Sequence, residues 1–110
     1  MITSGQGIRL KIYLDENNTV KGKSLYELIV LKARELNLNG ATVSRGIMGF
    51  GAHTDIHSAK ILRLSEDLPV IIELVDKEEN IRKIMPYLEE MIDEGLVTTE
   101  QVKMRIFRKD

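Results

Sequence analysis

The side chains best suited to bind a ligand gather in one glycine-rich, polar stretch of the chain, residues 40–60. Glycines at short spacing leave backbone N–H groups accessible and let a ligand approach the main chain closely. Basic and hydroxyl side chains beside them could donate hydrogen bonds to an anion. Taken alone, these residues favour an ordinary hairpin loop over a ligand-binding loop. The candidate ligand-binding residues of this stretch are Arg45, Gly49, Phe50, Gly51, His53, Thr54 and Lys60.

The same stretch contains a weaker candidate for a metal site. His53, Asp55 and His57 alternate along the sequence, so on an extended chain their side chains would share one face and could hold a divalent metal. Both histidines would have to be neutral, and a fourth ligand would be needed. No other residue clearly supplies that ligand. Solvated loop histidines are the favoured interpretation, and a metal-dependent enzyme centred on these three residues remains an alternative.

Familiar catalytic motifs are missing from the sequence. It contains neither a Walker-type phosphate loop nor the Gly-x-Ser-x-Gly turn of the hydrolases. It has no cysteine, which excludes thiol catalysis, disulfides and cysteine-ligated metals. Both histidines lie in one loop, so a catalytic triad would have to be built there. We therefore expect that the protein is not an enzyme.

Length and charge place the chain in a broad class. Its 110 residues suit one domain, and 43% of them are hydrophobic, which is enough for a core without disulfides. The net charge of −1 arises from mixed signs, so nothing favours binding to nucleic acid or to an acidic membrane. No apolar run is long enough to span a bilayer, and no signal peptide is recognisable. We expect a cytoplasmic protein.

Four strands are predicted from the hydrophobic pattern. Apolar and polar residues alternate over residues 8–14 and 102–107, which is typical of strands with one buried face. Residues 68–75 form an apolar run typical of a buried strand. Residues 41–44 begin a strand that leads into the glycine-rich stretch.

Two helices separate these strands. Ser24 with Glu27 and Asp76 with Glu79 both resemble capping boxes. The first helix should end near residue 38, and Gly95 should end the second. The resulting order, β-α-β-β-α-β, predicts an α+β fold of the ferredoxin-like class, with a four-stranded antiparallel sheet and both helices on one face.

Such a fold leaves the other face of the sheet uncovered. The residues expected there are too apolar for a freely solvated surface and too charged for a core, so a subunit interface is the favoured interpretation. A solvated face with a few apolar groups is the alternative. The residues expected on this face are Arg9, Lys11, Tyr13, Ile71, Glu73, Val75, Lys103, Arg105 and Phe107.

Several motifs together resemble the nitrogen-regulatory PII signalling proteins. In that superfamily the second strand runs through Gly-Phe-Gly into a long loop, and the chain returns through an apolar-Pro step into a buried strand. More closely, the chain is similar to the PII-like branch known as domain of unknown function 190. The motifs that carry the likeness are Gly40-Ala-Thr-Val-Ser44, Gly49-Phe-Gly51, His53-Thr54, the segment Ile56 to Pro69, Glu73-Leu-Val75 and Glu94-Gly-Leu-Val-Thr-Thr-Glu100.

The resemblance implies a PII-like homotrimer of single domains, each covering residues 1–110, with a mobile loop at about residues 49–66. A small effector, an adenine nucleotide or another anion, would bind in clefts between subunits and reorder that loop. The protein would thus be a non-catalytic regulator whose loop docks onto a partner such as a transporter or channel. A purely structural subunit of such a membrane protein is the alternative.

The chain departs from the PII pattern in three places. The tyrosine that many PII proteins carry for uridylylation is missing, and so is the arginine-bearing C-terminal tail. Gly95-Leu-Val-Thr-Thr-Glu-Gln101 replaces the phosphate-binding loop before the last strand. There Thr98 and Thr99 could donate hydroxyls to phosphate or simply form a local turn, and Arg105 follows as a further cation for an anionic ligand.

Overall fold

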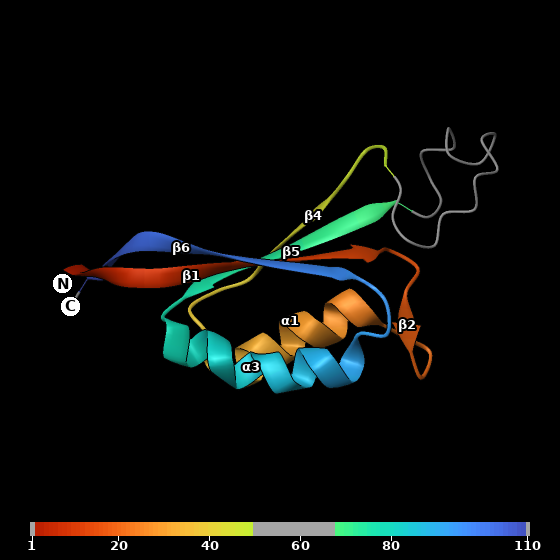
Figure 1. The fold of residues 1–110 in the computed structure, drawn as a ribbon, viewed down its shortest axis with the longest axis horizontal. Coiled ribbons are helices and arrows are strands. Elements are labelled where there is room, and N and C mark those ends of the chain that lie inside the picture. The colour runs from red at the N-terminus through yellow and green to blue at the C-terminus, as the bar shows by residue number, and fades with distance from the viewer. Residues whose placement is uncertain (1, 50–67, 110) are drawn as a thin grey trace.

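The computed structural model describes residues 2–49 and 68–109. Within these residues the chain forms two helices that lie together against one face of a four-stranded sheet (Figure 1). None of the described helices is long and apolar enough to cross a membrane. The elements are β1 (Ile2–Asp15), β2 (Thr19–Val20), β3 (Lys23–Ser24), α1 (Leu25–Glu35), β4 (Thr42–Arg45), β5 (Pro69–Asp76), α3 (Glu78–Met91) and β6 (Leu96–Phe107).

The sheet has the strand order β4-β5-β1-β6, and all neighbouring strands are antiparallel. This order confirms the predicted ferredoxin-like α+β fold. It places β5 and β1 in the centre, while β4 and β6 form the two edges. The loop that joins β4 to β5 therefore starts from one edge of the sheet, and β6 runs along the opposite edge.

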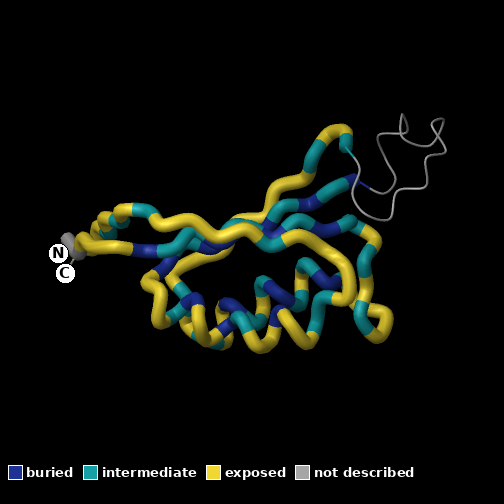
Figure 2. Tube along the Cα trace, in the orientation of Figure 1, coloured by how far each residue is buried: buried dark blue, intermediate teal, exposed yellow. Residues whose placement is uncertain are grey.

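The hydrophobic core lies between the sheet and the helices, as Figure 2 shows by the buried residues there. Alternate residues of β1 and β5 point into it, and both helices contribute an apolar face. By contrast, β4 and most of β6 are exposed. The buried core residues are Leu10, Ile12, Leu14, Leu25, Ile29, Ala33, Val70, Ile72, Leu74, Ile81, Ile84 and Leu88.

Two strands are longer than predicted. β1 begins at Ile2 and β6 at Leu96, and they pair without interruption from Ile2↔Phe107 to Tyr13↔Leu96. The added parts, residues 2–7 of β1 and 96–101 of β6, lack the regular apolar alternation that marks a half-buried strand. The β2–β3 hairpin was also not predicted; its turn residues Lys21 and Gly22 have φ of 52° and 79°.

The helix ends differ from the sequence predictions in their caps. α1 ends at Glu35, three residues earlier than expected. Asn37 then takes the left-handed conformation with φ of 61°, and the bonds Asn37 N–H to Arg34 O and Leu38 N–H to Ala33 O close the helix. Neither predicted capping box formed: the N-cap residues are Ser24 and Lys77, and neither side chain makes a cap hydrogen bond.

Asp76 instead joins two segments that are far apart in the sequence. Its side chain is fully buried, and its carboxylate accepts hydrogen bonds from Asn39 N–H at 2.8 Å and Asn39 Nδ2 at 3.0 Å. It also accepts from Lys77 N–H at 2.7 Å and Asn80 Nδ2 at 2.8 Å. Arg108 Nη2 donates to Asn39 Oδ1 at 3.0 Å. The residue thus fixes the segment before β4 to the junction of β5 and α3.

Candidate functional site

The candidate site begins where β4 and β5 diverge. Gly46 N–H donates to Pro69 O at 2.8 Å, which extends the β4–β5 ladder by one step. On the other side of β5, Glu16 N–H donates to Leu68 O at 2.9 Å. Both ends of the connection between these strands are therefore fixed to the sheet. We call Arg45–Gly49 together with Leu68–Pro69 the loop base.

Two glycines of the loop base are required by packing. A Cβ atom on Gly46 would lie 2.8 Å from Cγ of Pro69, and one on Gly49 would lie 3.1 Å from the same atom. The first distance is far below normal contact, and a proline ring cannot move aside as a flexible side chain can. Both glycines thus pack against the proline, so a structural role accounts for their presence.

Arg45 is held by an acidic residue at the loop base. Its Nη2 forms an ion pair and hydrogen bond with Oε2 of Glu16, the residue that follows β1. The Arg45 side chain is 60% exposed, whereas that of Glu16 is only 15% exposed. An anionic ligand could therefore reach the guanidinium from solvent, and replacing Glu16 would leave a largely enclosed carboxylate without its ion-pair partner.

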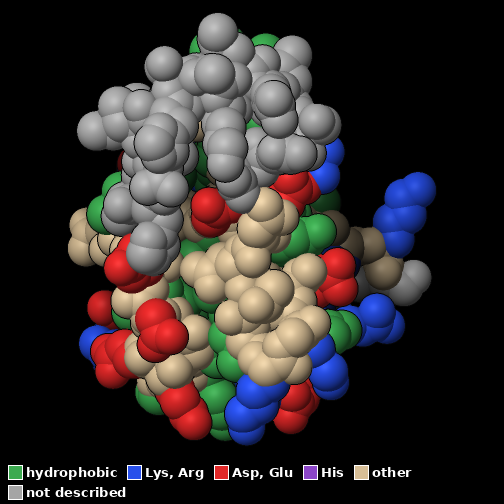
Figure 3. Space-filling model, turned by 90° about the vertical axis from the view of Figure 1, so that its right-hand side faces the viewer, with side chains coloured by type: hydrophobic (Ala, Val, Ile, Leu, Met, Phe, Trp, Pro, Cys, Tyr) green, Lys and Arg blue, Asp and Glu red, His purple; other side chains and the backbone are tan. Residues whose placement is uncertain are grey.

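The loop base also exposes a pair of apolar side chains that sequence reasoning missed. Ile47 is 83% exposed and Met48 is 56% exposed. No periodicity marks them, because they belong to neither a helix nor a strand, and exposure of adjacent large apolar residues is visible only in the structure. Figure 3, which faces the end of the molecule that carries the β2–β3 hairpin, shows acidic and basic side chains interspersed there.

Thr98 and Thr99 lie in β6, which corrects the expectation of a loop at this position. They pair with Lys11 and Leu10 of β1. The strand can begin as early as Leu96 because Gly95 fits closely against β1: a Cβ there would lie 2.8 Å from Leu14 Cδ2 and 3.1 Å from Tyr13 O. Their hydroxyls are therefore presented by a rigid edge strand.

Arg105 lies far from the loop base within one chain. It pairs with Ser4, which precedes Glu16 by twelve residues along β1. At about 3.3 Å per residue, that separation is roughly 40 Å. Thr98 and Arg105, seven residues apart on β6, are separated by roughly 23 Å on the same basis. The structure therefore does not bring Arg105 together with Arg45 or with the two threonines in a single subunit.

The remaining candidates cannot be placed. Among residues 2–49 and 68–109, there is no group of three or more His, Cys, Asp or Glu side chains that could hold a metal. The proposed ligands His53, Asp55 and His57 lie outside these residues. So do the candidate ligand-binding residues Phe50, Gly51, His53, Thr54 and Lys60.

The uncovered face of the sheet carries an ion-pair network across three strands. Arg9 Nη1 donates to Glu100 Oε1 of β6 at 2.7 Å, and Arg9 Nε lies 3.0 Å from Glu73 Oε1 of β5 as an ion pair without hydrogen-bond geometry. The hydrogen bond to Glu100 and the charge of that residue raise the pKa of the Arg9 guanidinium, which stays charged. This network is the centre of the face predicted as a subunit interface.

The register corrects the composition of that face. Because Arg9 pairs with Glu100, alternation along β6 places Val102, Met104 and Ile106 on the side of Arg9. Lys103, Arg105 and Phe107 therefore point to the opposite side, and their predicted place on the uncovered face was wrong. The prediction failed because alternation within one strand does not fix the pairing register between strands.

Comparison with known proteins gives three findings. The sequence profile of the DUF190 family, described as an uncharacterized ACR, matches residues 7–104. A UPF0166 protein of Aquifex aeolicus is 37% identical over 97 residues, covering 86% of this chain and 90% of the relative. Another, from Methanocaldococcus jannaschii, is 44% identical over 89 residues, covering 80% of this chain and 82% of the relative.

A solved structure shows the same fold. CPII, a nitrogen regulatory PII-like protein from Thiomonas intermedia K12, was solved bound to ADP, AMP and bicarbonate. It is similar to this chain with a TM-score of 0.66 over 93% of this chain and 98% of its own, at 13% sequence identity. This likeness bears on the fold alone. By the match over residues 7–104 and these relatives, the chain belongs to the DUF190 family and has a PII-like fold.

Proposed function

We propose that this protein is a non-catalytic, PII-like regulator that forms a homotrimer and binds an anionic small molecule between its subunits. An adenine nucleotide is the first candidate ligand. The loop between β4 and β5 would transmit binding to a partner protein, such as a transporter or channel.

One observation carries this proposal: the candidate ligand-binding residues lie on opposite edges of the sheet. Arg45 is at the end of edge strand β4, whereas Thr98 and Thr99 are on edge strand β6. Three strand spacings separate these edges, or about 14 Å. In a ring of identical subunits, the same two unlike surfaces meet at every contact, so the β4 edge of one subunit would face the β6 edge of the next. Such a cleft would combine Arg45 of one subunit with the threonines of its neighbour.

The contacts of Arg45 suggest how binding would reach the loop. In the free subunit Arg45 is paired with Glu16. A phosphate or carboxylate in the cleft would compete for the guanidinium and release it from Glu16. Since Gly46 continues directly into the loop base, this exchange would alter how the loop leaves the sheet. Ordering or release of a loop is an established way to transmit ligand binding.

The exposed pair Ile47 and Met48 supports docking of a partner at the loop base. Adjacent exposed apolar side chains with polar surroundings are typical of protein interaction sites. This feature alone is also compatible with a purely structural subunit of a membrane protein. The two functions differ in one respect, because only the regulator requires a ligand in the cleft.

The experiment combines mass measurement with calorimetry. Light scattering should give the mass of a trimer, and titration with ADP, AMP, ATP and bicarbonate should show saturable binding of at least one of them. Arg45→Gln should weaken that binding roughly 10- to 100-fold, because a charge-assisted hydrogen bond contributes about 1.5–3 kcal/mol. Arg82→Gln is the matched control, since Arg82 is an exposed residue of α3 that forms an ion pair with Glu78 of the same helix. A trimer that binds none of these ligands at millimolar concentration would contradict the proposal.

A further inference from the structure

β1 extends beyond the end of its neighbour β5. The register of β1 with β5 runs from Asp15↔Pro69 to Ile8↔Asp76, after which the chain turns into α3. β1 continues for six more residues, Ile2–Gly7, and pairs there with β6. Within the described residues, no strand pairs with the other edge of this segment. The segment and its β6 partner form the ribbon at the end that carries the termini in Figure 1.

The hydrogen bonds of the ladder show which backbone groups face that edge. Glu16 donates its N–H toward Leu68, on the β5 side of β1. Since successive residues of a strand direct their N–H and C=O groups to opposite sides, the even-numbered residues of β1 all face the β5 side. The odd-numbered residues face β6. Ile2, Ser4 and Gln6 therefore direct their N–H and C=O groups to the edge where β5 is missing.

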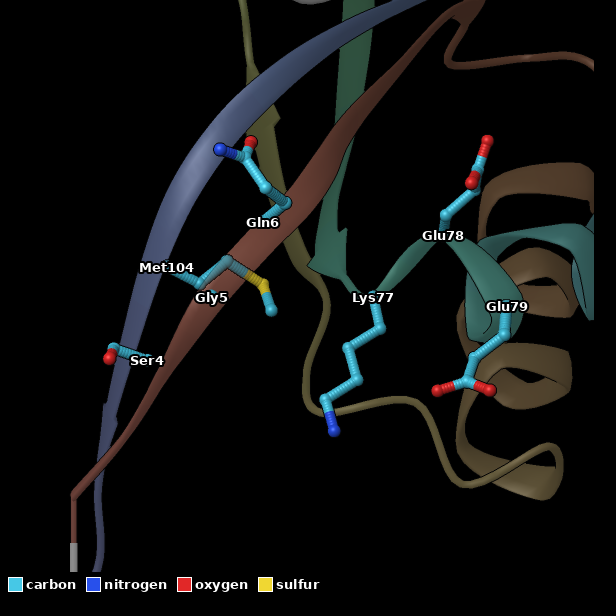
Figure 4. Close-up of a pocket in the computed structure, with 7 residues that line it drawn as sticks. All are labelled: Ser4, Gly5, Gln6, Lys77, Glu78, Glu79 and Met104. Atoms are coloured by element: carbon cyan, nitrogen blue, oxygen red, sulfur yellow. The ribbon is translucent and has the colours of Figure 1, made fainter.

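Space for another strand lies beside this edge. A hollow of about 400 Å³ is lined by Ser4, Gly5 and Gln6 on one side and by Lys77, Glu78 and Glu79 on the other. Figure 4 shows Met104 reaching across β1 toward the hollow, while Ser4 and Gln6 point to the other side of the strand. The wall of this hollow is therefore partly apolar, and α3 begins opposite it.

The edge lacks the features by which edge strands are usually protected from pairing. Charged side chains and prolines normally prevent such contacts. Ile2–Gly7 contains neither. The other edge of the ribbon, formed by β6, carries Lys103 and Arg105. Only the β1 edge of the ribbon is both unpaired in the described residues and uncharged.

The geometry points to a specific occupant: the Ile2–Gly7 edge of a second copy of this chain, paired antiparallel about a two-fold axis. Such a contact requires a self-complementary surface, and a segment without charge places no like charges opposite one another. The contact would complete the backbone hydrogen bonds of Ile2, Ser4 and Gln6 in both copies. It lies at the opposite end of the molecule from the loop base, so the candidate ligand site would stay accessible (Figure 1).

The backbone geometry that allows this pairing belongs to the single subunit. Its stability rests on the proposed trimer. One pair of six-residue edges buries less surface than stable interfaces require. Two trimers joined end to end would make three such contacts at once, which raises the overall affinity by effective concentration. The expected assembly is therefore a pair of trimers with their loops at opposite ends.

Ser4→Pro tests the pairing directly. Proline removes an N–H that faces the free edge and leaves the β6 ladder, which uses odd-numbered residues, intact. Ser4→Ala is the matched control, since it retains that N–H. We expect the wild type and Ser4→Ala to have twice the mass of Ser4→Pro in sedimentation equilibrium. The mass ratio reports the pairing, whereas the absolute mass of Ser4→Pro, that of three chains or of one, reports the trimer, so failure of the inference and failure of the proposed function can be told apart. Equal masses for wild type and Ser4→Pro would overturn the inference.

Hydrogen exchange provides a second readout that does not require a variant. In the paired state the amides of Ser4 and Gln6 should be protected to the same degree as those of Gly5 and Gly7, which face β6. Dilution to the single unit should release only Ser4 and Gln6. Rapid exchange of these two amides in the concentrated wild type, beside slow exchange of the two glycines, would show a free edge and refute the pairing.

Discussion

Replacing Asp76 with alanine should destabilise the protein strongly, because two distant segments are joined through one buried carboxylate. The four donors to it lie at 2.7–3.0 Å, and they belong to Asn39, Lys77 and Asn80. A buried donor left without a partner costs about 1–3 kcal/mol. Since some of the donors can find water at the segment ends, we expect a loss of about 3 kcal/mol in the free energy of unfolding. For 110 residues, at about 2.1 cal/mol/K per residue, this lowers Tm by about 13 °C.

The assay is thermal unfolding followed by circular dichroism at one fixed protein concentration, because assembly would otherwise shift Tm. Glu79→Ala is the matched control: Glu79 is an exposed acid in the first turn of the same helix, and its removal should change stability by less than about 0.5 kcal/mol. Asp76→Asn keeps the size of the side chain but places an NH₂ group among donors, so it should also be destabilising. If Asp76→Ala and Glu79→Ala had equal effects, the reasoning on the buried network would be refuted.

Three further predictions concern the loop base and the uncovered sheet face. In urea unfolding, Gly46→Ala should lower the free energy of unfolding by about 1–2 kcal/mol, because its Cβ would meet the ring of Pro69. Gly40→Ala, whose Cβ would meet open space, should not lower it. Equal losses in the two variants would contradict the packing. Arg9→Met should weaken formation of the proposed trimer at least tenfold, because Glu73 and Glu100 stay on the uncovered face without a counter-charge. Lys103→Met, on the opposite side of the sheet, should not weaken it. Identical curves of trimer dissociation for the two variants would show that the uncovered face is not part of the interface. Ile47→Asp should leave the unfolding free energy within about 0.5 kcal/mol of wild type, and a larger loss would show that the side chain packs within the subunit.

Elements with one buried face were predictable from the sequence. The alternation of Leu10, Ile12 and Leu14 marked the C-terminal half of β1, and the helical spacing of Ile81, Ile84 and Leu88 marked α3. Those patterns exist because the core selects apolar residues at the period of each element. The order of the elements then led to the sheet topology that the structure has.

What failed depended on pairing between distant strands. The parts that were missed, residues 2–7 of β1 and 96–101 of β6, each pair with the predicted part of the other strand and show no regular apolar alternation, so nothing in their composition announces a strand. For the same reason Thr98 and Thr99 were expected in a loop. The register that moved Arg105 off the uncovered face is likewise a property of two strands, and one sequence shows it only when both strands are complete.

The place of the loop base along the chain was predictable, but its geometry was not. The glycine-rich stretch after residue 40 pointed to the loop base, yet the packing of Gly46 and Gly49 on Pro69 and the pair of Arg45 with Glu16 join residues far apart in the sequence. The largest gain from the structure is the separation of Arg45 from Thr98 across the sheet. That separation is the observation on which we propose a ligand cleft between two subunits, as the resemblance to PII proteins implied.

Cross-linking tests this central claim most directly. The chain has no cysteine, so Ser44→Cys on β4 and Thr98→Cys on β6 introduce thiols only at the two edges, both on the uncovered side by register. Within one chain the edges are about 14 Å apart. A disulfide needs Cα atoms within about 7 Å. We predict that mild oxidation of the double variant gives covalent dimers and trimers on a denaturing gel, whereas neither single variant does. Only monomers from the double variant, or equal dimers from a single variant, would contradict a cleft formed by the β4 edge of one subunit and the β6 edge of the next.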